Sequence, residues 1–250
     1  MDRKLGLVSI SFRGHTPGEI LEAMKKSGLQ FIEWGSDVHA PPERAAQIAA
    51  LTRDAGIQCC SYGTYFRLGA NPIGELNSYI TAAKTLGTNI LRLWCGGKNS
   101  DDFTPEEKAE LFETCRAAAK VAEESGVVLC MECHNNTFTN RKEAALELMQ
   151  AVNAPHFQMY WQPNQFRTEA ENLAYATLLA PYTQVVHVFN WEARARLPLK
   201  EAAQVWKKYL SCFPREVPCL LEFVPDDKLE TLGKEARALQ EIVYGTDFCV

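Results

Sequence analysis

Three ionisable residues interrupt otherwise apolar segments in the second half of the chain. Glu132 lies in VVLCMECH, His187 in TQVVHVFNW and Glu222 in VPCLLEFVP. Burying a carboxylate without a partner costs several kcal/mol, so each glutamate must be paired, metal-bound or protonated. Two carboxylates and an imidazole are suitable ligands for a divalent cation such as Mn²⁺, Mg²⁺ or Co²⁺. The same carboxylates could move a proton to and from a carbon next to a carbonyl group.

Residue parity indicates that these side chains face the same way as other chemically useful groups. Alternate residues of a strand point to the same side, so Glu132 and His134 share a face. Taken singly, a His or Glu within a strand is more often part of a hydrogen-bonded core than a ligand. Here, however, polar residues lie near the ends of several successive strand segments, and Gln162 lies between Glu132 and His187 in the sequence. Such a set favours a functional site over a hydrogen-bonded core.

The elements that could bring these residues together follow a regular alternation. Short apolar segments recur at roughly 30-residue intervals, and each is followed by a segment with helical spacing. Thr-Pro pairs at 16–17 and 104–105 predict helix starts, and glycines at 28, 56, 87 and 126 predict helix ends. Eight such units predict one α/β domain over residues 1–250, a single (β/α)₈ TIM barrel. The alternative, an open doubly wound sheet, is disfavoured because no Gly-rich phosphate turn follows the first strand.

Polar and aromatic residues lie at the expected C-terminal ends of the strands, where barrel enzymes carry their chemistry. Aromatic rings there would stack on the apolar faces of a sugar, and arginines could bind a carboxylate or phosphate. The loops NWEARARLP and VPDDK contain no glycine, so we do not expect the usual barrel phosphate cup after the last two strands. The residues that we expect to contact substrate are Trp34, Arg92, Trp94, His134 and Asn164.

Composition excludes several other classes of protein. The 250 residues carry a net charge of −5 and no basic block, so a nucleic-acid partner is not expected. No apolar run approaches the ~20 residues of a membrane span, and the first residues do not read as a signal peptide. We therefore expect a cytoplasmic protein without a membrane partner. The nine cysteines are odd in number and irregularly spaced, which is typical of reduced thiols rather than a disulfide framework.

The chain resembles the xylose-isomerase-like TIM barrels, a superfamily of sugar isomerases, ketose 3-epimerases, inosose dehydratases and endonuclease IV. The resemblance covers essentially the whole chain. It is carried by GLQFIEWGSDVHAPP, SYGTYFRLG, NILRLWCG, CMECHNNTFT, VVHVFNW and CLLEF.

This resemblance implies a metal site and a pair of catalytic residues. Glu132, His187 and Glu222 match three of the four metal-binding positions of the family's epimerases, whose two glutamates also exchange the proton. The fourth position, an aspartate in the family, is Gln162 here. An amide oxygen can still bind a hard cation but brings no charge, so we expect the metal to bind more weakly or to be absent. The resemblance also implies a homo-oligomer.

The sequence thus predicts an isomerase or epimerase that moves a proton next to the carbonyl of a ketose or related polyol. Glu132 and Glu222 would exchange the proton, and the metal would be held by Glu132, Gln162, His187 and Glu222. One alternative is an inosose-type dehydratase. Another is a non-catalytic or metal-free barrel that binds a sugar or polyol, for which Gln162 is the main support. DNA repair is disfavoured by the acidic charge and by a count of only five histidines.

Overall fold

Eight parallel strands close into a barrel in the computed structural model, which describes residues 3–245. The strands neighbour one another in the order β1-β10-β7-β6-β5-β4-β3-β2, and the ring closes between β2 and β1. The predicted TIM barrel is therefore confirmed. The strands are β1 (Leu5–Val8), β2 (Phe31–Gly35), β3 (Gln58–Leu68), β4 (Ile90–Cys95), β5 (Val128–Glu132), β6 (Phe157–Trp161), β7 (Thr183–Val188) and β10 (Cys219–Leu221).

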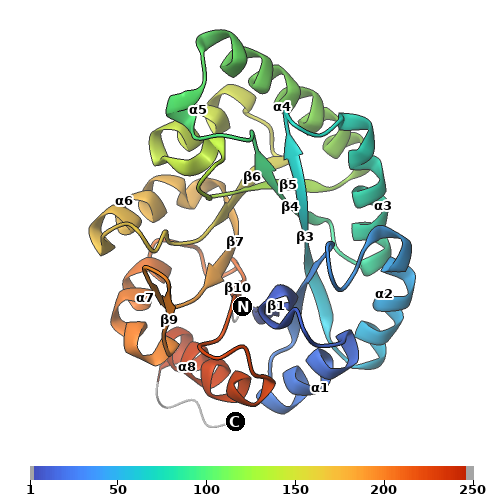
Figure 1. Ribbon diagram of the computed structural model, residues 1–250, viewed down its shortest axis with the longest axis vertical. Helices are drawn as coiled ribbons and strands as arrows, with labels where there is room; N and C mark the ends of the chain where they lie inside the picture. Colours follow the sequence, from blue (N-terminus) through green and yellow to red (C-terminus); the bar gives the residue numbers. More distant parts are fainter. Residues whose placement is uncertain (1–2, 246–250) are drawn as a thin grey trace.

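An α-helix follows each barrel strand, and together the helices form a ring outside the strands (Figure 1). They are α1 (Pro17–Ser27), α2 (Ala45–Asp54), α3 (Leu76–Leu86), α4 (Pro105–Ser125), α5 (Lys142–Val152), α6 (Glu169–Leu179), α7 (Ala203–Leu210) and α8 (Leu232–Tyr244).

The helix boundaries lie where the Thr-Pro pairs and glycines predict them. Thr16 and Thr104 each cap a helix and accept a hydrogen bond from the backbone N–H of a glutamate three residues later. That glutamate side chain returns a bond to the cap, so two otherwise unpaired N–H groups are satisfied. At the other end, Gly28 has a φ of 73°, a left-handed conformation that glycine adopts without strain.

The barrel separates two apolar regions. The larger lies between the strands and the helices and contains residues such as Ile32, Leu91 and Leu239. The smaller fills the barrel interior and consists of Val8, Ile10, Cys130, Tyr160, Val185 and Leu220. Tyr160 of this inner layer contacts His187, so the polar residues at the C-terminal ends of the strands lie against a packed apolar layer.

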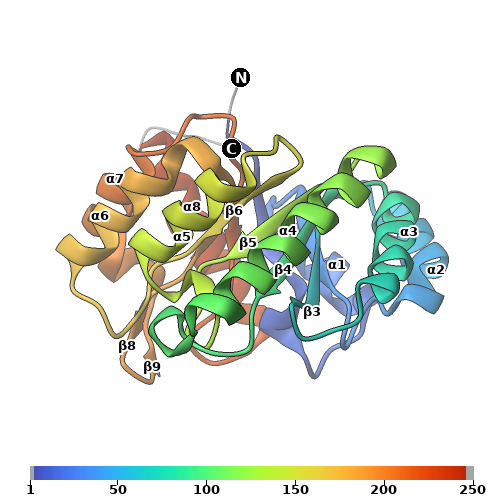
Figure 2. The same cartoon turned by 90° about the horizontal axis from the view of Figure 1, so that it is seen from above.

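A short hairpin after β7 was not predicted. The segment NWEARARLP reads as a polar loop, but β8 (Trp191–Glu192) and β9 (Ala195–Arg196) pair antiparallel within it. The turn places Ala193 at a φ of 51°. Figure 2 shows this hairpin projecting beyond the barrel. The pattern was missed because two-residue strands are too short to show alternation.

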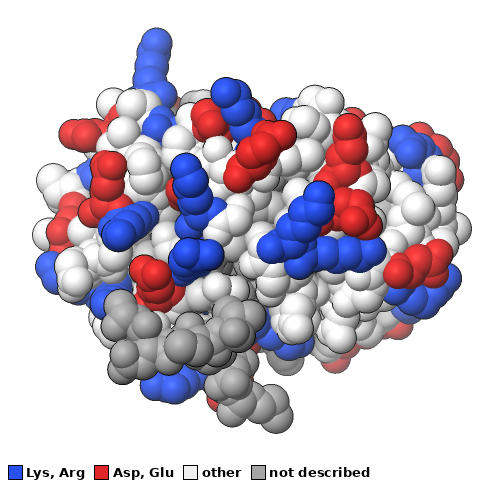
Figure 3. Space-filling model, turned by 90° about the horizontal axis from the view of Figure 1, so that it is seen from below, with Lys and Arg blue, Asp and Glu red and all other residues white. Residues whose placement is uncertain are grey.

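The distribution of surface charge and the state of the cysteines match what the composition predicts. On the face seen in Figure 3, acidic and basic side chains are interspersed rather than gathered into a patch of one sign. Within residues 3–245, no helix is both long and apolar enough to cross a membrane. The eight cysteines in that range are free thiols, and Cys249 lies outside the described residues.

Candidate active site

Three elements bring Glu132, His187 and Glu222 together at the C-terminal end of the barrel. Glu132 ends β5, His187 lies near the end of β7, and Glu222 directly follows β10. One potential ligand atom from each residue lies within 4.8 Å of the other two, and all three residues are buried. A separation above about 10 Å would have contradicted the predicted site, so the geometry expected from the sequence is present.

One nitrogen of His187 is the centre of this cluster. Its Nδ1 lies 3.3 Å from Glu222 Oε2, 3.7 Å from Glu132 Oε1 and 3.3 Å from Gln162 Oε1. Burial lowers the pKa of His187, but the negative charges of Glu222 and Glu33 outweigh this effect and raise the pKa well above its ordinary value. Nδ1 is thus surrounded by acceptor oxygens, so it must either carry a proton or face a cation.

These four residues fit a divalent cation. The donor set is two carboxylates, an imidazole nitrogen and an amide oxygen, which suits Mn²⁺, Mg²⁺ or Co²⁺ better than a softer ion. The side-chain Nε2 of Gln162 donates to the carbonyl of Cys133 at 3.3 Å. This hydrogen bond orients the amide so that Oε1 faces the cluster. Gln162, the predicted fourth ligand, therefore presents an oxygen toward the cluster.

Arg92 fixes one of the two glutamates. Its Nη1 donates to Glu132 Oε2 at 2.5 Å, and Trp94 Nε1 donates to the same oxygen. Burial raises the pKa of Glu132, but the charges of Arg92 and His187 outweigh it and hold this pKa well below its usual range. Among the described residues no hydrogen-bond partner reaches Arg92 Nη2. Arg92 lines the cavity as expected, although its main contacts are carboxylates of the protein.

Sequence reasoning missed Glu33 as a site residue. This glutamate on β2 is fully buried inside the barrel, where its carboxylate contacts Arg92, His187 and Tyr160. Burial raises its pKa, but the charges of Arg92 and His187 lower it to about 2. The signal was present, because Glu33 interrupts the apolar segment FIEWG as Glu222 interrupts LLEF.

A cavity of about 390 Å³ opens above these polar groups. Aromatic rings line part of it among many polar side chains: the Trp94 and His134 rings stack with centroids 4.9 Å apart, and Tyr65 meets Trp94 edge-on at 5.1 Å. On the opposite side Trp191 stacks on Phe223 at 5.0 Å. The volume and the lining are typical of a pocket for one small molecule.

Two predicted contact residues lie on the rim of this cavity with some of their polar atoms already engaged. His134 Nδ1 lies 2.6 Å from the carbonyl of Asn135. Asn164 Nδ2 donates to Asn135 Oδ1 at 2.8 Å, and Asn164 Oδ1 accepts from the N–H of Phe166 at 2.9 Å. Asn164 therefore holds the loop after β6 against the loop after β5, and it also lines the cavity.

The expectation that Trp34 lines the mouth is wrong. Its side chain is fully buried in the outer core, where Nε1 donates to Thr52 Oγ1 of α2 at 3.0 Å. Glu33 and Trp34 are adjacent in β2, so only one of them can face the barrel interior. Since Glu33 faces inward, Trp34 must pack outward against the helices.

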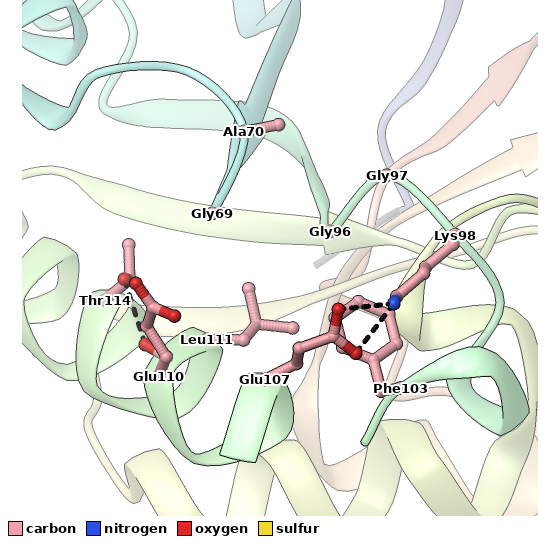
Figure 4. A pocket seen from close by; sticks show the side chains of 10 residues that line it. All are labelled: Gly69, Ala70, Gly96, Gly97, Lys98, Phe103, Glu107, Glu110, Leu111 and Thr114. Atoms are coloured by element: carbon pink, nitrogen blue, oxygen red, sulfur yellow. Dashed lines mark hydrogen bonds and ion pairs between the residues drawn. The ribbon is translucent and has the colours of Figure 1, made fainter. Parts of the chain in front are cut away.

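A second hollow lies outside the barrel mouth, between α4 and the loops after β3 and β4 (Figure 4). Its volume is about 370 Å³. Lys98 Nζ pairs with both carboxylate oxygens of Glu107 at 2.8 and 2.7 Å, and Leu111 lies beside this pair. None of the residues predicted to do chemistry line this hollow, so the cavity in the barrel mouth is the candidate active site.

The fold and the position of the site define a TIM barrel with its polar cluster at the C-terminal ends of the strands. The chain belongs to the xylose isomerase-like TIM barrel family, whose model matches residues 21–197. This confirms the resemblance inferred from the sequence motifs.

Individual relatives are more distant. A 3-dehydroshikimate dehydratase of Bacillus anthracis is 24% identical over 170 residues, which are 62% of this chain and 60% of that protein. The crystal structure of the probable 3-DHS dehydratase of Bacillus anthracis superposes with a TM-score of 0.80 at 19% identity, over 95% of this chain and 98% of that one. A D-allulose 3-epimerase from Methylomonas sp., solved with D-allulose, has a TM-score of 0.74 at 13% identity, over 97% and 98% of the two chains. At these identities the structures share the fold with this chain.

Proposed function

We propose that this protein is an enzyme that removes a proton from the carbon next to the carbonyl of a polyhydroxylated ketone. The observation that carries the proposal is the convergence of Glu132, His187 and Glu222 in a buried cluster at a cavity lined by polar side chains and aromatic rings. Carboxylates placed beside a cation site are the groups that such a proton transfer needs.

The metal would be held by Glu132, Gln162, His187 and Glu222. When bound, a divalent cation supplies Lewis-acid stabilisation of the negative charge that develops on the carbonyl oxygen. Arg92 pairs with Glu33 and Glu132, and Glu222 lies against His187, so three carboxylates meet only two basic side chains and a dication would also balance charge there.

Glu222 is the better proposed base of the two glutamates. Arg92 and Trp94 donate to Glu132, which stabilises its anion and weakens it as a base. Among residues 3–245 no arginine or tryptophan donates to the Glu222 carboxylate, which faces the same cavity. A proton taken from the substrate would therefore reside on Glu222.

The cavity walls indicate the kind of substrate. Its aromatic rings suit the apolar faces of a sugar or cyclic polyol, and His134 and Arg92 supply donors for hydroxyl or carboxylate oxygens. A volume of about 390 Å³ accommodates a molecule of monosaccharide size.

For the fate of the carbanion we propose dehydration. One base suffices: Glu222 takes the proton, the electron pair forms a double bond, and the neighbouring C–O bond breaks. The hydroxide that leaves takes the proton back from Glu222 and departs as water. The hydrogen bonds that Glu132 accepts from Arg92 and Trp94 support this one-base route, because they keep Glu132 ionised. The similarity to a 3-dehydroshikimate dehydratase supports it as well.

The second candidate is isomerisation or epimerisation of a ketose, which the sequence predicts. The observation in its favour is that both Glu132 and Glu222 line one cavity, since epimerisation needs a group on each face of the carbon. In that reaction Glu132 would have to give or receive the proton as readily as Glu222.

The test is a panel of ketoses and cyclic polyol ketones, 3-dehydroshikimate among them, incubated with the Mn²⁺-loaded protein in D₂O. Loss of water from a substrate supports dehydration, and deuterium at a retained carbon supports isomerisation or epimerisation. Glu222→Gln should lower either rate by roughly 10²–10⁴-fold. Full activity of Glu222→Gln would contradict the assigned base.

Calorimetry separates both reactions from the non-catalytic alternative. A metal-free sugar-binding barrel would release no heat with Mn²⁺ and would bind a polyol without changing it. Heat of Mn²⁺ binding that disappears in Glu222→Gln would instead support the proposed enzyme.

A further inference from the structure

Glu33 lies one layer below the cation cluster and contacts it without lining the cavity. Its side chain is fully buried, and Oε1 accepts from Arg92 Nε at 3.0 Å. Oε2 accepts from Ser61 Oγ at 2.9 Å and from the Tyr160 hydroxyl, and it lies 3.4 Å from His187 Nε2. The two carboxylate oxygens thus have different partners.

These contacts fix how Glu33 meets the imidazole. Arg92 Nε carries a hydrogen and can only donate, so Oε1 must remain an acceptor. Oε2 is then the oxygen that faces His187 Nε2. Since an ionised carboxylate only accepts hydrogen bonds, Nε2 must carry a proton to make this contact favourable.

The other nitrogen of the ring is thereby made available. With its proton on Nε2, a neutral imidazole has its lone pair on Nδ1, which faces Gln162 Oε1 and Glu222 Oε2 at 3.3 Å each. The Tyr160 ring supports this orientation from the side, with ring centroids 4.5 Å apart. Metal-binding histidines commonly have their second nitrogen fixed by a carboxylate in this way.

We propose that Glu33 is the positioning residue of this site: it holds the proton of His187 on Nε2 and presents Nδ1 to the cation. This inference rests on the metal site of the proposed function. Glu33 also holds Arg92, whose other contact fixes Glu132, so one buried carboxylate orients groups from both sides of the cluster.

Replacement by glutamine reverses the hydrogen bond. In Glu33→Gln the amide oxygen must take the Oε1 position, because Arg92 Nε still needs an acceptor. The amide NH₂ then faces His187 Nε2 and donates to it. The ring proton is displaced to Nδ1, where it blocks the nitrogen that the cation would use.

Two measurements test this, and neither depends on turnover. The first is the affinity for Mn²⁺ by calorimetry, which should fall about 10–100-fold in Glu33→Gln. The second is the ¹⁵N spectrum of the histidine rings in metal-free protein, recorded at a pH high enough that His187 has lost one of its two ring protons. Nε2 of His187 should carry a proton in the unmodified protein and lack one in Glu33→Gln.

Two controls separate positioning from general stability. Glu235→Gln removes another buried carboxylate, one that accepts from the N–H of Leu199 away from the cavity, and should leave Mn²⁺ affinity unchanged. Tyr160→Phe removes one donor to Glu33 but leaves the carboxylate, so His187 should keep its proton on Nε2. If Glu33→Gln does not fold, the ¹⁵N spectrum of Tyr160→Phe still tests the proposal. Loss of the Nε2 proton of His187 in that variant would show that Tyr160, and not Glu33, determines where the proton lies.

The possible results are distinct. Equal Mn²⁺ affinity in the unmodified protein and in Glu33→Gln, or an unprotonated Nε2 in the unmodified protein, would overturn the role of Glu33. If the unmodified protein binds no Mn²⁺, the metal of the proposed function fails. The ¹⁵N spectra would then still decide whether Glu33 holds the His187 proton.

Discussion

Glu132 and Glu222 differ in how firmly the protein holds them. Glu132 receives hydrogen bonds from Arg92 and Trp94, whereas the Glu222 carboxylate makes its close contact with His187. This difference suggests a division of roles between two residues that look equivalent in the sequence. We propose that Glu132 stays ionised beside the cation and that Glu222 carries the proton.

Gln162 offers the sharpest single-residue test of the cation site. Gln162→Asp would add a full negative charge beside the three other ligands, and we expect Mn²⁺ affinity to rise by roughly tenfold, about 1.4 kcal/mol. Calorimetry measures this directly. Aspartate is one methylene shorter, so a crystal structure must show that its carboxylate reaches the cluster. Unchanged affinity with the carboxylate in place would mean that no cation binds there.

At the scale of single elements, the strands position the site by alternation. In β4, Arg92 and Trp94 face the interior, as do Tyr160 of β6 and Gln162 directly after that strand. The same rule, applied to β2, assigns Glu33 to the interior and Trp34 to the outer core. The sequence interpretation of Trp34 was wrong because it weighed residue type above this alternation.

Gly63 of β3 leaves the space that the buried ion pair occupies. A Cβ at this position would lie 2.4 Å from Glu33 Oε1 and 2.8 Å from Arg92 Nη2. We expect Gly63→Ala to lower the free energy of unfolding by about 1–3 kcal/mol through overpacking and to weaken Mn²⁺ binding. Urea unfolding and calorimetry check the two effects.

Gly97→Ala is the matched control, because no atom lies within 4 Å of a Cβ built there. It should change neither the stability nor the metal affinity. Equal behaviour of the two alanine variants would show that the Glu33–Arg92 pair tolerates movement and is not a rigid support.

The sequence predicts the elements of this barrel better than the pairing within its site. Helix caps, glycine ends and apolar periodicity are local, so they identify the strands and helices and bring Glu132, His187 and Glu222 to one end. Which polar groups then bond to each other depends on strand register and barrel closure. The contacts of Arg92 with Glu33 and Glu132 join three strands, and no local pattern contains them.

At the scale of the whole molecule, a net negative charge is buried inside the barrel. Glu33, Glu132 and Glu222 lie around Arg92 and His187, between the apolar inner layer of the barrel and the cavity at its mouth. Burying this many carboxylates is expensive unless positive charge accompanies them. A bound dication would supply it, which links folding stability to metal binding.

The pH dependence of unfolding should report this buried charge. The pKa of Glu33 is about 2 in the folded protein and near its ordinary value when unfolded, so its ionised form stabilises the fold fully above about pH 4.5. That stabilisation is lost as pH falls from there toward 2. In urea unfolding of metal-free protein, the stability difference between the unmodified chain and Glu33→Gln should therefore shrink over this range. A difference that stays constant would show that Glu33 is not ionised in the native state.

The most direct test of the account is anomalous diffraction at the manganese edge from crystals equilibrated with Mn²⁺. We predict one strong peak within ligand distance of Glu132, His187 and Glu222, about 2.0–2.6 Å from their coordinating atoms, with Nδ1 as the nitrogen ligand. Crystals of Glu222→Gln treated in the same way should show a weaker peak. The absence of a peak at this cluster in well-ordered crystals at saturating Mn²⁺ would contradict the proposed metal-dependent chemistry.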